Sequence, residues 1–227
     1  MSVFSMGKLR IVDLTKVLDP ATETRRCKLQ RFNTGGRIPD FHTHMDITSH
    51  LGTHVECPYH HQEDWPDVSA LPLTGFLGRA LYVTVRDLAP NSYIGARALE
   101  SACAGRLREG DILILDSPYK LPPFTEKTNT PEDKRLLING ETATWLRDRK
   151  VKCVGFGDGV SIDNRNEDVR PFHDICMAEN IVFLEVLKNL ELLQRDVFFL
   201  SYAPLPIRGL DSCPVRVYAV EGLVEFS

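Results

Sequence analysis

Short apolar segments alternate with amphipathic helical segments through the middle of the chain. Residues 110–116 (GDILILD) and 152–157 (KCVGFG) have the length and composition of buried strands. Helical patterns occupy residues 95–107, 138–150 and 171–180. Strands that alternate with helices are typical of α/β proteins with parallel strands, and this alternation limits the fold more than any other feature of the sequence.

Strand patterns predominate toward both ends of the chain. They occupy residues 9–18, 41–50, 79–88, 181–190, 196–207 and 214–223. We therefore predict one α/β domain over residues 1–227, built on a mixed β-sheet. Two long polar segments, residues 20–40 and 117–135, are predicted to be exposed loops, and loops of this length are usually either disordered or functional lids.

Charge and apolar content exclude several classes of function. The chain has 27 Lys and Arg against 31 Asp and Glu, so its net charge of −4 offers no basic face for nucleic acid. The apolar segments are too short to span a bilayer, and the N-terminus lacks the pattern of a signal peptide. The six cysteines are scattered, which predicts reduced thiols in a cytoplasmic protein. We expect a small-molecule substrate and neither a nucleic-acid nor a membrane partner.

Histidine is concentrated in one short segment. Six of the seven histidines fall between residues 42 and 61, in HTHMDITSHLGTHVECPYHH. His50, His54, Glu56 and His60 would share one face of an extended chain, and the glycine and proline among them could bend that face around a point. Imidazole and carboxylate are the ligands of zinc and its first-row neighbours. A solvated, histidine-rich edge strand is the alternative interpretation.

A carboxylate interrupts a second apolar segment far along the chain. Glu185 lies within IVFLEVL, and a buried carboxylate must be paired, protonated or bound to a cation. Alternatively, this strand is an edge strand and Glu185 faces water. His173, which precedes the strand, is the only histidine outside the cluster. Together His173 and Glu185 could complete a site of nitrogen and oxygen ligands.

These residues match a known pattern. The segment HLGTHVECPYH, from His50 to His60, resembles the HxGTHxDxPxH signature of the cyclase-like metal-dependent hydrolase family, which includes bacterial kynurenine formamidase and isatin hydrolase. The spacing between His173 and Glu185 (185 − 173 = 12) is similar to that of the family's distal His/Glu pair. The chain is identified as a member of this family. The resemblance implies a swivelling β/α/β fold, a homodimer or homotetramer, and one or two divalent ions per chain, with zinc expected first and manganese second.

The resemblance also implies roles for single residues. The implied metal ligands are His50, His54, Glu56, His173 and Glu185, and the implied acid/base is His60. Glu56 stands where the family usually has aspartate, and its extra methylene moves the carboxylate outward by about 1.5 Å, a single-bond length. The number of ions therefore stays open.

The activity implied is hydrolysis of a C–N bond in a small amide by a metal-activated water. The amide could be an aryl formamide, a lactam or a cyclic imide. Two alternatives remain, namely hydrolysis of a lactone at the same metal site and a non-catalytic metal- or ligand-binding protein.

The sequence indicates the roles of other residues near the motif less specifically. We expect His42, His44 and His61 to be solvated or to orient a ligand, and Asp46 is a candidate orienting partner. Trp65 and Phe41 could form the wall of a pocket or belong to the core. Asp158, Ser161 and Asp163 follow a predicted strand, where a functional loop and a capped turn are equally good interpretations. Cys57 is expected to be a buried structural thiol.

Overall fold

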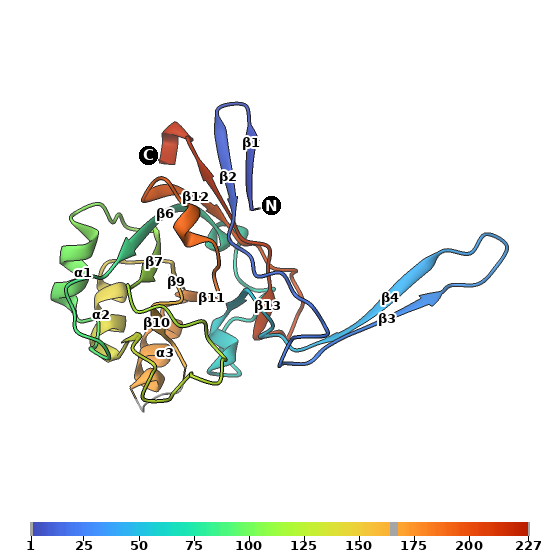
Figure 1. Ribbon diagram of the computed structural model, residues 1–227, viewed down its shortest axis with the longest axis horizontal. Coiled ribbons are helices and arrows are strands. Elements are labelled where there is room, and N and C mark those ends of the chain that lie inside the picture. Colours follow the sequence, from blue (N-terminus) through green and yellow to red (C-terminus); the bar gives the residue numbers. More distant parts are fainter. Residues whose placement is uncertain (1, 164–167, 227) are drawn as a thin grey trace.

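A mixed sheet of ten strands forms the centre of the molecule in the computed structural model, which describes residues 2–163 and 168–226 (Figure 1). In order across the sheet the strands are β1 (Val3–Met6), β2 (Leu9–Asp13), β14 (Tyr218–Glu221), β12 (Val197–Ser201), β6 (Leu77–Thr84), β7 (Ile112–Asp116), β9 (Cys153–Phe156), β11 (Val182–Glu185), β5 (His54–Glu56) and β13 (Ser212–Pro214). Strands β6, β7, β9 and β11 are parallel, and the strands on either side of them pair antiparallel. The predicted mixed α/β fold is confirmed.

Three helices pack against one face of the parallel strands. They are α1 (Ala96–Cys103), α2 (Gly140–Asp148) and α3 (Val169–Ala178). Leu113 and Leu115 of β7 belong to the core cluster on the helical face, whereas Ile112 and Ile114 belong to the cluster on the opposite face. Because both faces of β7 are buried, its sequence is continuously apolar and does not alternate.

Shorter elements complete the fold. Four 3₁₀ turns are η1 (Pro58–His60), η2 (Leu73–Phe76), η3 (Leu190–Leu192) and η4 (Val224–Phe226). Strands β8 (Leu136–Leu137) and β10 (Val160–Ser161) form a small parallel pair. None of the helices in the described part of the chain is long and apolar enough to cross a membrane.

A two-stranded hairpin extends away from the body of the molecule (Figure 1). Its strands are β3 (Cys27–Asn33) and β4 (Phe41–Ile47), and we call residues 27–47 the arm. Large apolar side chains on the arm are exposed to solvent, including Leu29, Ile38, Phe41 and Met45. The arm therefore presents apolar surface that the rest of its own chain does not cover.

The predicted helices and most predicted strands are present, but three segments differ from expectation. Residues 20–40 were predicted to be a loop, yet β3 lies within them, because both faces of the arm are exposed and its sequence carries no burial pattern. The strand predicted over residues 41–50 ends at Ile47, and it lies on the arm instead of leading directly into the site. Strand β1 was not predicted.

Candidate metal centre

The candidate site begins where β11 pairs with β5. Glu185 is the last residue of β11 and lies directly opposite His54 on β5 in the antiparallel register. Residues that oppose one another across a sheet point to the same face, and Glu56, two residues after His54, shares that face. Strand β11 is an interior strand between β9 and β5, and Glu185 is only 7% exposed. The alternative of an edge strand with Glu185 in water is therefore wrong.

Two bends bring the other histidines of the motif to this face. Gly52 has φ +60°, a left-handed conformation that favours glycine, and a Cβ there would lie 2.4 Å from Leu18 Cδ2. After β5, Pro58 starts the 3₁₀ turn η1, which ends at His60. His50 and His60 thus reach the cluster from bends on either side of the strand, as the positions of glycine and proline suggested.

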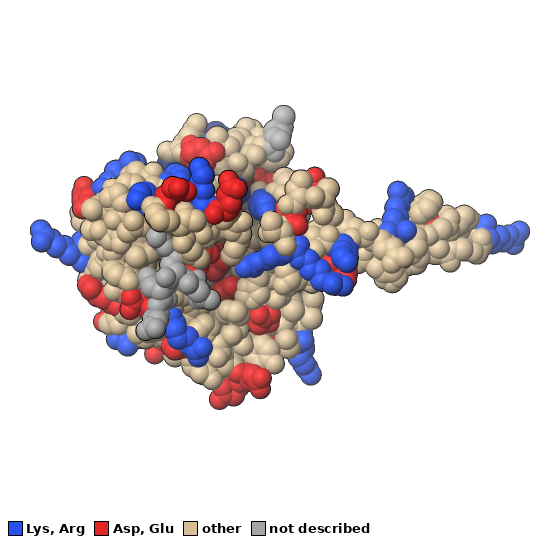
Figure 2. All heavy atoms as spheres, turned by 60° about the horizontal axis from the view of Figure 1, so that its bottom comes forward, with Lys and Arg blue, Asp and Glu red and all other residues tan. Residues whose placement is uncertain are grey.

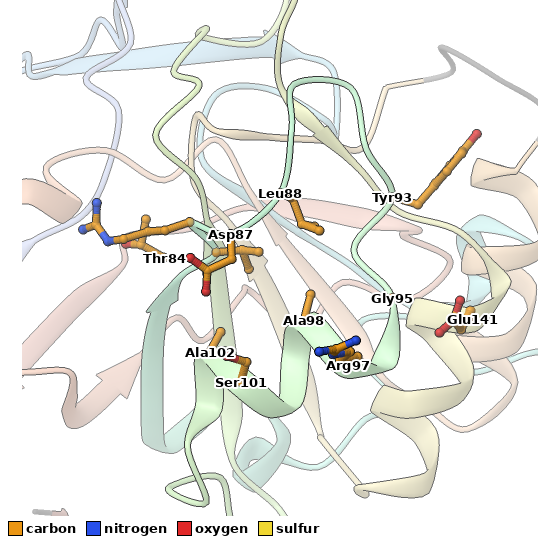
Figure 3. Close-up of a pocket in the computed structure, with 12 residues that line it drawn as sticks. Thr84, Asp87, Leu88, Tyr93, Gly95, Arg97, Ala98, Ser101, Ala102 and Glu141 are labelled. Carbon is orange, nitrogen blue, oxygen red and sulfur yellow. The ribbon is translucent and has the colours of Figure 1, made fainter.

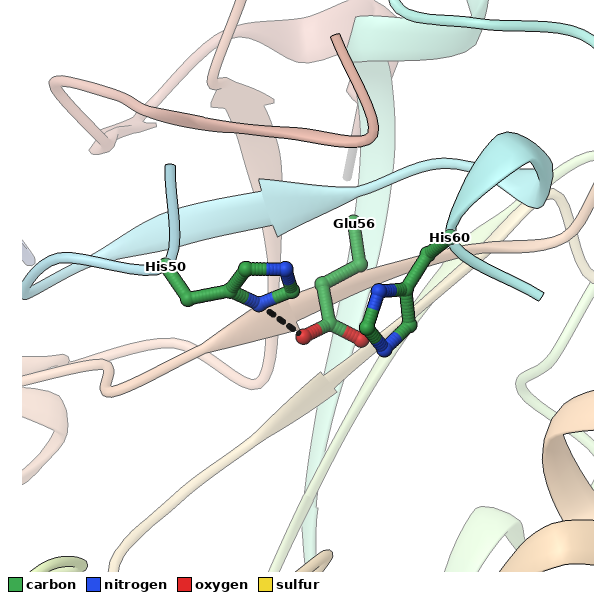
Figure 4. Close-up of side chains that lie close together, drawn as sticks. All are labelled: His50, Glu56 and His60. Carbon is green, nitrogen blue, oxygen red and sulfur yellow. Dashed lines mark ion pairs between the residues drawn. The ribbon is translucent and has the colours of Figure 1, made fainter. Parts of the chain in front are cut away.

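The other four predicted metal ligands lie around the Glu56 carboxylate, with His50 on one side of it (Figure 4). His50 Nδ1 lies 2.6 Å and His54 Nε2 lies 3.4 Å from Glu56 Oε1. On the other oxygen, His173 Nε2 lies 3.8 Å from Glu56 Oε2. His54 Nε2 is also 3.6 Å from Glu185 Oε2. Residues separated by more than 130 positions in the sequence (185 − 54 = 131) therefore form one cluster of nitrogen and oxygen atoms.

Hydrogen bonds fix which ring nitrogens face the carboxylates. Nδ1 of His54 lies 2.8 Å from the Gly52 carbonyl, and Nδ1 of His173 lies 2.9 Å from the Val169 carbonyl. A carbonyl oxygen only accepts, so each Nδ1 carries a hydrogen and each Nε2 is the ring nitrogen that faces the carboxylates.

One carboxylate oxygen of the cluster lacks a donor among the described residues. Glu56 Oε2 is buried and has no hydrogen-bond partner among the described residues. Acceptors that face one another in a buried site repel unless a cation lies between them. The donor set of imidazole nitrogen and carboxylate oxygen fits zinc or a neighbouring first-row metal.

The electrostatics of the cluster are those of a site short of positive charge. Burial and the nearby charge of Glu56 raise the pKa of Glu185 to about 8. Burial also acts to raise the pKa of Glu56, but hydrogen bonds from two histidines hold it well below its usual range. Burial lowers the pKa of His173 to about 4, so its imidazole is neutral and able to bind a metal at pH 7.

Glu56 belongs to two possible metal-binding groups. One consists of His50, Glu56 and His60, and the other of His54, Glu56 and Glu185; in each, the ligand atoms lie within 4.8 Å of one another. His60 is at the surface of the cluster, with its ring centroid 4.6 Å from that of His50. The two groups are compatible with one ion or two, and His60 is their exposed member.

Asp211 belongs to the site, and the sequence did not point to it. His50 Nε2 lies 2.8 Å and His60 Nδ1 lies 3.3 Å from Asp211 Oδ2. Hydrogen bonds from both rings hold the pKa of Asp211 well below its usual value. For His50, burial lowers the pKa, but its own hydrogen bonds to Asp211 and Glu56 outweigh burial and raise the pKa to about 9. Asp211 stands alone before β13, in a segment with no motif, so no local pattern could have revealed it.

A cavity of about 700 Å³ opens onto the cluster. Two of its walls come from the long polar segments, since residues 20–40 contribute Arg25 and residues 117–135 contribute Phe124. Its lining consists of Arg25, Thr48, His50, Glu56, His60, His61, Phe124, Thr128, Asn129, Ile162, Asp163, Val169, Arg170, His173 and Glu185. The cavity gives a small molecule access to His60 and the two carboxylates.

A second cavity of similar volume lies beside α1 (Figure 3). Its lining includes Asp87, Arg97, Ser101 and Glu141 but no histidine. Glu141 is already engaged there as an acceptor for the backbone N–H of Ala96, 2.9 Å away. The second cavity therefore lacks the nitrogen and oxygen cluster that distinguishes the first.

Among the remaining histidines, only His61 is close to the site. His61 Nδ1 lies 2.9 Å from Asp174 Oδ1, and its ring stacks on His173 with centroids 4.6 Å apart. His42 and His44 are exposed on the arm. The orienting role considered for Asp46 is wrong, because this residue is also on the arm and pairs with Arg26.

The other residues near the motif have structural environments. Phe41 is exposed on the arm, and Trp65 packs against the core beside the helices, so neither lines the cavity. Cys57 is fully buried in the core, where burial raises its pKa. Asp163 does line the cavity, but it pairs with the buried Arg135 at 2.6 Å. Ser161 is buried, and Asp158 pairs with Lys188 at 2.8 Å.

Comparisons with known proteins identify the family of the chain. The Cyclase family model matches residues 12–164. Kynurenine formamidase of Salinibacter ruber is 30% identical over 177 residues, which cover 76% of each chain. Kynurenine formamidase of Bordetella petrii is 26% identical over 178 residues, covering 75% of this chain and 76% of the relative.

Solved structures share the fold. Isatin hydrolase A from Ralstonia solanacearum superposes with a TM-score of 0.73 at 23% identity, over 94% of this chain and 92% of that one. The structure of an isatin hydrolase bound to the product analogue thioisatinate superposes with a TM-score of 0.75 at 18% identity, over 96% of this chain and 94% of that one. The fold, the donor cluster and these relatives together define a metal-dependent hydrolase. The chain belongs to the Cyclase family.

Proposed function

We propose that this protein hydrolyses the C–N bond of a small aryl formamide at a divalent metal held by His50, His54, Glu56, His173 and Glu185. The observation that carries the proposal is the buried Glu56 Oε2, which has no donor among the described residues and faces Nε2 of His173 at 3.8 Å, while His50 and His54 contact the other oxygen of the same carboxylate. Relatives named kynurenine formamidase support an aryl formamide as the substrate. We propose zinc as the metal, with manganese second, because imidazole and carboxylate ligands suit both ions.

The residues around the cluster supply the remaining chemistry. A divalent cation in such a site polarises a carbonyl and lowers the pKa of water from 15.7 toward about 7. His60, exposed to the cavity, takes the proton of the attacking water and returns it to the nitrogen of the departing aryl amine. Asp211 holds the rings of His50 and His60 in position through hydrogen bonds to both.

Metal removal tests the proposal directly. We expect protein purified without added metal to contain one or two zinc or manganese ions per chain and to release aniline from formanilide. A chelator should abolish aniline release, and adding back zinc should restore it more fully than manganese. Hydrolysis of lactones without hydrolysis of formanilide would show a C–O hydrolase instead. Metal-loaded protein that cleaves neither would contradict an enzymatic role.

We also propose that the protein assembles as a homodimer or homotetramer through the arm. An isolated two-stranded hairpin is marginally stable in water, and the arm exposes apolar side chains along its length. Uncharged surface covers much of the arm in Figure 2. A second copy of the chain could cover this surface and stabilise the hairpin.

Charges on the arm should break this assembly. Leu29 and Met45 oppose one another across the hairpin and are 53% and 67% exposed. We expect the double variant Leu29→Glu/Met45→Glu to run as a monomer in size-exclusion chromatography with light scattering, while the wild type runs as a dimer or tetramer. The matched control is Arg37→Glu, which adds negative charge at the tip of the arm. Monomeric wild-type protein at micromolar concentration would contradict the assembly.

We propose a cytoplasmic location for the protein. All six cysteines are unpaired thiols, and five of them are buried. Unpaired thiols are usual in the reducing cytoplasm and less so in oxidising compartments.

A further inference from the structure

Arg25 brings a positive charge to the wall of the cavity that contains the metal ligands. It lines this cavity and a smaller adjoining one of about 240 Å³, together with His50 and Phe124. One guanidinium N–H donates to the backbone carbonyl of His50. The guanidinium carbon lies 4.1 Å from the centroid of the Phe124 ring. Two loops distant in the sequence thus meet over the site through these two side chains.

Contacts hold this pair in place. Phe124 has φ +62°, a conformation that bulky residues rarely adopt, so the surrounding loop holds its ring over the guanidinium at an energetic cost. A guanidinium above an aromatic face is attracted by the ring quadrupole. The same contact leaves the edge of the guanidinium open for hydrogen bonding. An arginine has five N–H donors, and among the described residues only one of those of Arg25 has a protein acceptor.

Arg25 differs from the other cations around these cavities. Arg170 binds Asp174 at 3.1 Å, Lys16 binds Glu23 at 2.7 Å, and Lys188 binds Asp158 at 2.8 Å. Within residues 2–163 and 168–226, no carboxylate pairs with Arg25.

A half-buried guanidinium without a carboxylate partner is suited to bind an anionic group of a ligand. We propose that Arg25 is a specificity residue that binds a carboxylate on the substrate, so that the enzyme prefers aryl amides that carry a carboxylate. The proposal rests on the proposed function, because it places the scissile amide at the metal cluster and the carboxylate at Arg25 in the same cavity. Phe124 keeps the guanidinium plane oriented, and the open edge can form two parallel hydrogen bonds with a carboxylate. Neutral aryl amides would lack this contact.

The test compares acids with matching amides in two proteins. The probes are 2-aminobenzoate and 2-aminobenzamide, with a second pair that carries the carboxylate or carboxamide at the end of a two-carbon chain. Binding to metal-loaded wild type and Arg25→Gln is measured by calorimetry, and kcat/KM is measured for the corresponding formamides. Any carboxylate–metal contact is common to both proteins, so the ratio between them isolates Arg25.

We expect Arg25→Gln to reduce the preference for acid over amide by about ten- to hundredfold in at least one pair, as expected for a hydrogen bond to a charged group. Arg25→Lys should retain part of the preference, and Arg170→Gln should retain all of it. An equal loss of affinity and of kcat/KM for acid and amide would show that Arg25 only joins the two loops and would overturn the inference. Unchanged preference in both pairs would overturn it too. A binding preference without formamide hydrolysis would support the inference and contradict the proposed function.

Discussion

Replacing His60 by glutamine should lower kcat by about 10²- to 10⁴-fold while the metal content per chain stays the same. A positioned acid/base contributes a factor of this size, and glutamine removes the titrating nitrogen while keeping a polar side chain of similar reach. His60 lies at the cavity surface of the cluster and is held by Asp211 at 3.3 Å. Elemental analysis and steady-state hydrolysis of formanilide on the same preparation measure both quantities.

The neighbouring histidine provides a matched control. His61 lines the same cavity but pairs with Asp174, and His61→Gln should retain most of the activity. His60 also lies within reach of a metal group with His50 and Glu56. Loss of bound metal from His60→Gln would make His60 a ligand, and full activity in this variant would remove it from the mechanism.

Replacing Glu56 by alanine should weaken metal binding, because Glu56 is the residue that the two possible metal groups share. We expect metal affinity to fall by more than about a hundredfold, since substitutions in the outer shell of metal sites alone cost 10- to 100-fold. Hydrolysis should fall in parallel and should not recover at metal concentrations that saturate the wild type. Competition with a chelating dye measures the affinity.

Two further variants make this prediction specific. Glu56→Asp restores the residue of the family signature and should still bind at least one ion. Asp158→Asn removes a carboxylate that pairs with Lys188 outside the cluster, and its metal affinity should match the wild type. An unchanged affinity in Glu56→Ala would remove Glu56 from the metal site. Titration of zinc into Glu56→Asp and the wild type compares the numbers of ions bound.

Much of the fold follows from patterns that the sequence displays locally. Continuous apolar segments such as residues 112–116 predict strands buried on both faces, and helices between them require parallel pairing. Strand β3 of the arm was missed, because pattern analysis detects burial and the arm is exposed on both faces.

The residues of the site also divide into those that a local sequence pattern reveals and those that it does not. His50, His54, Glu56 and His60 lie within one motif, and Glu185 is conspicuous because it interrupts an apolar strand. Asp211, Arg25 and Phe124 reach the site through loops and sheet pairings that leave no periodic pattern. Their roles depend on three-dimensional proximity, which a single sequence does not report.

The pairing of β5 with β11 couples metal binding to folding. His54 and Glu185 meet only after strands 131 residues apart have aligned (185 − 54 = 131), a long-range event that topology makes slow. The unfolded chain, however, still has six histidines between residues 42 and 61, and these can bind the same ion locally. A ligand that also binds the unfolded state stabilises the native state less than its affinity suggests. Excess zinc during refolding should therefore slow the recovery of native protein, because the ion must leave its local ligands before the sheet can close around it.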